Sequence, residues 1–145
     1  MLAGRLCIPL VMAAATVPLS PTAAASTWEQ WVSPSGEIFC GIAVFDAGDG
    51  IAECELDYRA WRPPPRPENC VGGYYGDRIV LLSGKPAAFE CYGDTLHDTG
   101  LPILGYGESV SVGSFTCVNE AAGTTCTDNT TGHYFMIGPD TYELG

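Results

Sequence analysis

Short runs of β-branched and aromatic residues alternate with turn residues along most of the chain. No stretch keeps apolar residues at i, i+3, i+4 and i+7 for more than two turns, because glycines and prolines interrupt every candidate. This pattern is typical of an all-β protein. It predicts strands at 37–44, 51–57, 78–82, 87–92, 109–118, 124–128 and 133–137, with a last edge strand at Tyr142 and Leu144.

The short connections between most of these runs favour antiparallel pairing of consecutive strands. We therefore expect an all-β fold, a small antiparallel β-sandwich or partly open barrel of about seven or eight short strands. The expected organisation is a signal peptide at 1–25, an N-terminal segment at 26–36 and a single disulfide-rich β domain at 37–145. A mature chain of about 120 residues suits one domain.

The first twenty-five residues have the composition of an export signal. Arg5 is their only charge, an apolar stretch runs from Leu6 to Leu19, and the alanines at 23–25 fit the small-x-small pattern of a cleavage site. The apolar stretch is shorter than the roughly twenty residues that span a bilayer. We expect cleavage near Ala25, no stable membrane insertion afterwards, and a protein that is secreted or in the cell envelope. A retained anchor is the alternative.

Cleavage also removes Cys7 and leaves six cysteines, an even number that indicates a disulfide framework in a short exported chain. None of them has the C-x-x-C spacing of a zinc ribbon or a redox pair. Six cysteines allow many pairings, and counting does not choose among them. The six are Cys40, Cys54, Cys70, Cys91, Cys117 and Cys126.

One hairpin suggests how the cysteines pair. In SFTCVNEAAGTTCTD, a four-residue turn at 120–123 with glycine last places Cys117 directly opposite Cys126. Directly opposite residues of an antiparallel pair are close enough for a disulfide. The segment FCGIAVFDAGDGIAECEL resembles a looser version of the same plan. The expected pairs are Cys117–Cys126, Cys40–Cys54 and, by elimination, Cys70–Cys91.

The charge of the mature chain is strongly negative. Seventeen acidic and five basic residues remain after cleavage, which gives 5 − 17 = −12. Such a charge argues against nucleic acid and anionic membrane surfaces as partners. It indicates solubility outside the cell, with a specific cationic partner as the alternative.

Three of the five cations lie in or beside AWRPPPRPENC. Its prolines favour an extended polyproline II path. We interpret this segment as a stiff connector whose arginines pair with acids. A docking motif at 64–67, which fits P-x-x-P, is the alternative.

His133 and Ser35 are the candidate catalytic residues. A serine hydrolase needs a serine, a base and an orienting acid brought together by the fold. The chain has no G-x-S-x-G elbow, and SPSG around Ser35 is also an ordinary turn composition. We interpret His133, in TTGHYFMI, as the residue that begins a strand. A small secreted hydrolase using His133 with Ser35 or an acid is the alternative.

No cofactor or metal site is expected. His97, Asp98 and His133 form a thin ligand set without carboxylate pairs at suitable spacing. The loop FDAGDGIAE lacks the calcium-loop spacing because residues 48 and 50 are both glycine. Glycoside cleavage needs a pair of carboxylates, and the sequence singles out no pair among its seventeen acids.

Aromatic residues are numerous, and several neighbour glycines in VGGYYGD and LGYGES. They serve either as parts of a thin core or as a platform for a ligand. The possible ligand-facing aromatics are Tyr74, Tyr75, Tyr106 and Tyr134.

Several of these segments together resemble a family of small exported actinobacterial proteins that carry a domain of unknown function. The resemblance runs from about Trp31 to the C-terminus, and its most specific patterns are S-P-S-G-x-I-x-C and G-x-T-C-x(5)-G-H-x-F. This chain has Glu37 where the family pattern has asparagine most often, which weakens a side-chain-specific role there. The resemblance implies export from a high-GC Gram-positive bacterium, with all six cysteines in the domain. It transfers no active site. The segments are SPSGEIFC, AECEL, WRPPPRPENC, FECYGDT, LGYGES and FTC…GTTCTDNTTGHYF.

The leading hypothesis is an exported, disulfide-stabilised β domain of unknown biochemical activity. We expect a non-catalytic protein that binds an unknown protein or glycan, or that is purely structural, in the cell envelope or the extracellular space.

Overall fold

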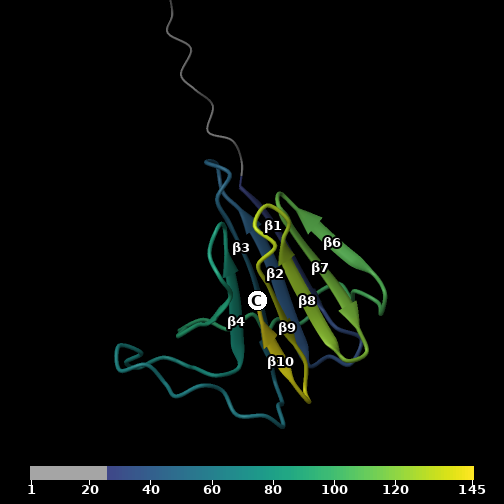
Figure 1. Cartoon of the computed structure of the whole chain (residues 1–145). Coiled ribbons are helices and arrows are strands. Elements are labelled where there is room, and N and C mark those ends of the chain that lie inside the picture. Colours follow the sequence, from purple (N-terminus) through teal and green to yellow (C-terminus); the bar gives the residue numbers. More distant parts are fainter. Residues whose placement is uncertain (1–25) are drawn as a thin grey trace, which may run out of the picture.

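The computed structural model describes residues 26–145 (Figure 1). The expected signal peptide at 1–25 and its cleavage near Ala25 lie outside the described residues. Within those residues the structure contains no helix that is long and apolar enough to cross a membrane. It contains ten strands: β1 (Thr27–Val32), β2 (Ile38–Val44), β3 (Gly50–Leu56), β4 (Arg78–Leu82), β5 (Ala88–Phe89), β6 (Ser109–Val112), β7 (Phe115–Glu120), β8 (Gly123–Asp128), β9 (Tyr134–Ile137) and β10 (Tyr142–Leu144).

The strands form two five-stranded sheets, ordered β1-β2-β3-β4-β5 and β10-β9-β8-β7-β6, with every pair of neighbours antiparallel. Each sheet is a meander, because neighbouring strands are consecutive in the chain. The two sheets lie face to face around a shared core (Figure 1). The all-β expectation is confirmed, and of its two forms the structure is the sandwich.

The centre of the core is built around two disulfides, one from each sheet. Cys40 pairs with Cys54 across β2 and β3, and Cys117 pairs with Cys126 across β7 and β8. The Sγ atoms of Cys54 and Cys126 are 3.9 Å apart, so the two bridges pack against each other. Their neighbours alternate between core and outer face, as the two-residue period of a strand requires.

The three expected cysteine pairs are confirmed, since Cys70 is also bonded to Cys91. The expected register of the β7–β8 hairpin is confirmed too, with Cys117 opposite Cys126 and Glu120 opposite Gly123. Disulfides of this number in a small domain indicate an oxidising compartment outside the cytoplasm.

The strand count is higher than the expected seven or eight for two reasons. The expected strand at 109–118 is two strands, because Gly113 takes a positive φ of 59° and turns β6 back into β7. β1 was not among the expected strands. Trp31 is the only buried residue of β1, so the strand shows little alternation of apolar and polar residues. β1 enters the sheet by pairing with β2.

The expected strand at 87–92 is mostly wrong, because only Ala88–Phe89 pairs with β4. After Phe89 the chain leaves the edge of the first sheet. Tyr92 then forms an isolated bridge with Tyr74 instead of a sheet ladder.

The proline-rich connection between β3 and β4 closes one end of the core. The Trp61 indole N–H donates to the carbonyl of Gly138 at 2.7 Å, and the ring packs against Phe89 and Tyr142. The expected pairing of its arginines with acids is not what the structure shows. Arg59 and Arg66 donate instead to backbone carbonyls of their own connection. These arginines therefore make contacts within the connection, and Trp61 fixes the connection to the end of β9.

Asp128 joins the two sheets at the other end. Its carboxylate accepts the N–H of Gly84, which follows β4, and both the N–H and the hydroxyl of Thr130. Burial by itself raises the pKa of Asp128, but these hydrogen bonds outweigh it and lower the pKa to about 2. The Asp128 carboxylate therefore remains ionised and hydrogen-bonded at neutral pH.

Candidate functional site

The outward face of the first sheet carries three charged side chains that are almost fully buried. β3 and β4 alternate, so Cys54 and Ile79 face the core while Glu53, Glu55 and Arg78 face the opposite side. These three residues are 8%, 7% and 6% exposed. Charged side chains on an outer face are normally solvated. Something must cover them.

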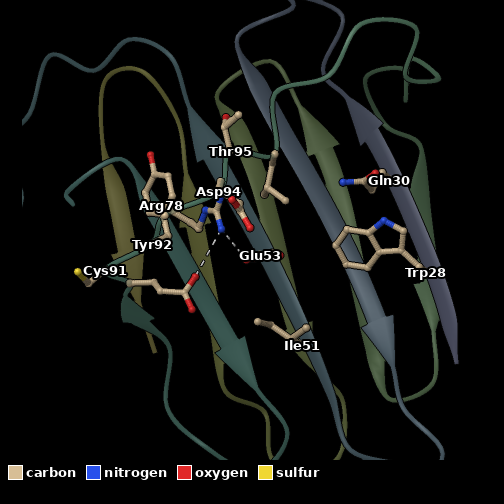
Figure 2. Close-up of a pocket in the computed structure, with 12 residues that line it drawn as sticks. Trp28, Gln30, Ile51, Glu53, Arg78, Cys91, Tyr92, Asp94 and Thr95 are labelled. Carbon is tan, nitrogen blue, oxygen red and sulfur yellow. Dashed lines mark hydrogen bonds and ion pairs between the residues drawn. The ribbon is translucent and has the colours of Figure 1, made fainter. Parts of the chain in front are cut away.

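The cover is residues 90–96, which we call the strap segment. It runs from the end of β5 back across the outer face of β3 and β4 (Figure 2). The Cys70–Cys91 disulfide ties its start to the proline-rich connection, and Tyr92 and Tyr74 exchange two backbone hydrogen bonds. Further along, the Glu55 carboxylate accepts the hydroxyl of Thr95 at 2.7 Å and the N–H of Leu96 at 2.8 Å. The strap segment is therefore fixed at both ends.

Arg78 is the centre of this cluster. Its guanidinium donates to Glu55 at 2.7 Å and to Glu53 at 3.3 Å, and it also donates to the carbonyl of Asp94. Glu90 is 3.7 Å away. The guanidinium carbon lies 3.8 Å from the centre of the Tyr92 ring, a cation–π contact. One cation therefore organises both the sheet face and the strap segment.

The two buried glutamates have pKa values shifted in opposite directions. Burial raises the pKa of Glu53, and the attraction of Arg78 only partly offsets it. Burial also acts to raise the pKa of Glu55, but hydrogen bonds from Arg78, Leu96 and Thr95 outweigh it and lower the pKa. Glu55 is the fixed anion of the cluster.

A groove of about 500 Å³ opens between the strap segment and β1. Figure 2 shows Arg78, Tyr92, Asp94 and Thr95 on one side of it, with Trp28 and Gln30 on the other. The lining is completed by Ile51, Glu53 and the rest of the strap segment.

Trp28 forms the far wall because a glycine lies beneath it. For a Cβ placed on Gly41, in the neighbouring strand β2, the three nearest atoms would all be carbons of the Trp28 ring, the closest at 2.5 Å. The indole therefore lies directly on the backbone of β2. It remains 43% exposed, so part of the ring is free for a ligand.

A second cavity of about 390 Å³ shares Tyr92, Gly93 and Thr95 with the groove and is also lined by Tyr74. The rings of Tyr74 and Tyr92 have their centres 5.7 Å apart, and Tyr74 is 65% exposed. The Tyr92 hydroxyl donates to Asp77 at 2.8 Å. Burial and this hydrogen bond both raise the pKa of Tyr92, which keeps it neutral. The two cavities adjoin at these three strap residues, with Trp28 lining one of them and Tyr74 the other.

Of the four tyrosines expected to face a ligand, only Tyr74 lines this surface. Tyr75 packs against Phe89, with ring centres 6.1 Å apart. Tyr106 is exposed in the loop before β6, and the Tyr134 hydroxyl lies 3.4 Å from Glu143 on the other sheet.

His133 and Ser35 lie next to strands of different sheets and show no contact with each other within the described residues. Ser35 lies in the turn between β1 and β2, where its hydroxyl is 2.9 Å from that of Ser33. His133 directly precedes β9, and its ring Nδ1 lies 3.3 Å from the backbone carbonyl of Gly145. Within residues 26–145 its ring has no carboxylate or hydroxyl partner.

Sequence reasoning missed the groove, although two signals were present. Glu53, Glu55 and Arg78 occupy outward positions in otherwise apolar strands, which is unusual for an exposed face. Trp28 is apolar at an outward position of a polar strand. Neither signal says that the strap segment, more than sixty positions beyond Trp28, lies opposite it.

Within residues 26–145 no group of three or more histidines, cysteines, aspartates or glutamates is arranged to hold a metal ion. At the groove the reason is visible, because the Arg78 guanidinium occupies the centre of the carboxylates.

A protein-family model described as "Family of unknown function (DUF6636)" matches residues 10–141. No curated protein and no solved structure matches the chain.

Proposed function

The chain belongs to the family of unknown function (DUF6636), whose description assigns no activity, and we propose a function for it from the geometry of its groove. The proposal is an exported, non-catalytic binding domain that holds its ligand on the outer face of the first sheet. Export into the cell envelope or the extracellular space is supported by the signal-like residues 1–25 and the three disulfides. The sequence motifs resemble those of actinobacterial exported proteins, so an actinobacterial host is part of the proposal.

One observation carries the binding role, namely an open groove whose polar groups are held rigid before any ligand arrives. Arg78, Glu55 and the strap segment are held together by an ion pair and hydrogen bonds, and a disulfide ties the strap segment to the proline-rich connection. A preorganised site loses less conformational entropy on binding. Pockets of this size are typical of small-ligand sites.

The contacts of Glu55 make it a structural anion rather than a catalytic group. Both carboxylate oxygens of Glu55 already accept hydrogen bonds, from Arg78, Thr95 and Leu96. A general acid or base needs a free lone pair or proton directed at the substrate. Among the described residues that line the groove there is no serine, free cysteine or histidine to act as a nucleophile or base.

The test is an NMR titration of the oxidised mature chain, residues 26–145, with two soluble probes, a neutral oligosaccharide and a lysine-rich peptide. Binding should shift the amide resonances of the strap segment and of β1. Shifts confined to the second sheet around His133, together with ester hydrolysis that is lost in His133→Ala, would instead establish the hydrolase alternative.

A further inference from the structure

We infer that the groove binds a neutral, β-linked, gluco-configured oligosaccharide, with one sugar ring stacked on Trp28. This inference rests on the proposed function and adds the chemical class of the ligand. It follows from the aromatic surfaces, the hydrogen-bonding groups and the charge of the groove, taken in that order.

The Trp28 ring is a flat and partly exposed aromatic surface fixed from below. Its benzo carbons lie where a Cβ of residue 41 would be, so the ring rests on the strand at Gly41. The face of an aromatic ring is electron-rich. The face of a β-gluco-configured pyranose presents a row of axial C–H groups, which are weakly electropositive. The two surfaces are complementary in shape and in polarity.

The groups beside Trp28 suit hydroxyls. Gln30 lines the same wall and offers an amide donor and acceptor. Across the groove the Glu90 side chain is 34% exposed and Asp94 is exposed, so both offer carboxylate oxygens. Equatorial hydroxyls at the rim of a stacked sugar ring point outward toward such groups. Polar groups around an aromatic surface therefore match a carbohydrate better than an apolar ligand.

The charge of the groove excludes acidic sugars. Its lining carries Glu53, Glu90 and Asp94 against the single cation Arg78, whose guanidinium already contacts Glu53 and Glu55. An anionic glycan would meet repulsion without a free cation to bind it. A cationic peptide also satisfies the charge, so it is one of the probes in the test below. Glu55, which lines the adjoining cavity, is closed to such a peptide because Arg78 and the strap segment occupy its oxygens.

The adjoining cavity indicates more than one sugar ring. It shares the strap residues Tyr92, Gly93 and Thr95 with the groove and is lined in addition by the exposed Tyr74. An extended chain of β-linked rings that starts on Trp28 would pass over the strap segment toward Tyr74. Trp28 and Tyr74 then contact different rings of one ligand.

The experiment is a calorimetric titration of the oxidised mature chain with cellotetraose and chitotetraose, and separately with tetralysine. We expect at least one of the two saccharides to bind. Trp28→Ala should weaken its binding at least about tenfold, as expected for an aromatic anchor. Trp28→Tyr keeps an aromatic face and should restore part of the affinity.

Gly41→Ala is the sharper variant, because it keeps the indole but removes the space in which the ring lies. It should weaken saccharide binding about as much as Trp28→Ala. Tyr106→Ala is the matched control, because Tyr106 is an exposed aromatic residue that does not line either cavity. The Tyr106→Ala variant should bind the saccharide with the same affinity as the wild type. Circular dichroism and thermal unfolding of each variant establish that the fold is retained.

Each outcome decides the matter. Saccharide binding that is lost in both Trp28→Ala and Gly41→Ala supports the inference. If both variants bind the saccharide with the affinity of the wild type, the role of Trp28 is overturned. Tetralysine binding without saccharide binding overturns the ligand class but leaves the proposed binding function standing. If no probe, including the peptide of the NMR titration, affects the groove, the inference and the proposed function both fail.

Discussion

Glu53 and Glu55 lie two positions apart on β3 and contact the same guanidinium, yet their pKa values shift in opposite directions. The difference is in hydrogen bonding, because Glu55 also accepts from Thr95 and Leu96 and Glu53 accepts only from Arg78. For Glu55 the bonds outweigh burial, and for Glu53 burial prevails. Of these two glutamates, only Glu55 therefore stabilises the fold as an anion.

The two glutamine substitutions should separate these roles. Glu55→Gln should lower the free energy of unfolding by roughly 2–3 kcal/mol at neutral pH, since it removes a charged acceptor of several bonds. The lowered pKa means that this contribution is present above the unfolded value, near 4.5, and is lost as pH falls through the folded pKa. The deficit of Glu55→Gln should therefore shrink in acid.

Glu53→Gln should show the opposite trend. A raised folded pKa means that stability from Glu53 is present below 4.5 and is lost as pH rises through the folded value. Because glutamine mimics the protonated form, Glu53→Gln should gain stability relative to the wild type between pH 4 and pH 7. Urea unfolding of both variants at pH 4, 5.5 and 7 checks this. Parallel pH profiles for the two variants would contradict it.

At the scale of the elements, the junction of β8 and β9 depends on a close backbone approach. Gly123 begins β8, and a Cβ there would overlap the carbonyl of Ile137 at the end of β9. The neighbouring pair Thr124 and Ile137 is in register, so neither strand is free to move away. The glycine that favours the hairpin turn in the sequence thus has a second role, in the packing of the next strand.

We expect Gly123→Ala to destabilise the protein by about 2–4 kcal/mol, because backbone atoms rather than a flexible side chain must move. Gly93→Ala is the matched control, since a Cβ there has nothing within 4 Å. Its effect should stay within about 0.5 kcal/mol. Thermal unfolding of both variants makes the comparison, and equal losses would mean that the contact at Gly123 is unimportant.

At the scale of the whole molecule, the disulfides act in two different places. Cys117–Cys126 lies in the core with both residues fully buried, whereas Cys70–Cys91 ties the strap segment to the proline-rich connection. Loop closure predicts that Cys70–Cys91 stabilises the protein more, because its sequence separation is 21 against 9 for Cys117–Cys126. Core packing predicts that Cys117–Cys126 contributes more, because replacing its buried cysteines with alanine would leave a cavity.

We expect packing to dominate. Each pair of alanine substitutions should cost about 3 kcal/mol from chain entropy, and Cys117→Ala/Cys126→Ala should cost more through the cavity. Cys70→Ala/Cys91→Ala should mainly free the strap segment, visible as faster hydrogen exchange of the Leu96 amide. A larger loss of stability in the Cys70→Ala/Cys91→Ala protein would show that loop closure dominates instead.

Local contacts were predictable from the sequence. The strands of the two hairpins and the pairs Cys40–Cys54 and Cys117–Cys126 follow from a turn signal with alternating residues on either side. Cys70–Cys91 followed only by elimination. The break of the expected strand 109–118 at Gly113 was missed, because one glycine in an alternating run does not reveal its φ.

The sequence by itself determined the all-β class, the pairs Cys40–Cys54 and Cys117–Cys126 and the strongly negative net charge, because each depends on residue type or on spacing across a single hairpin. Only the tertiary structure decided the groove. Trp28 meets the strap segment because β1 pairs with β2, β4 pairs with β3, and the chain then crosses back over the sheet. Such long-range approach depends on sheet order and on the path of a loop, and neither leaves a periodic pattern in the sequence.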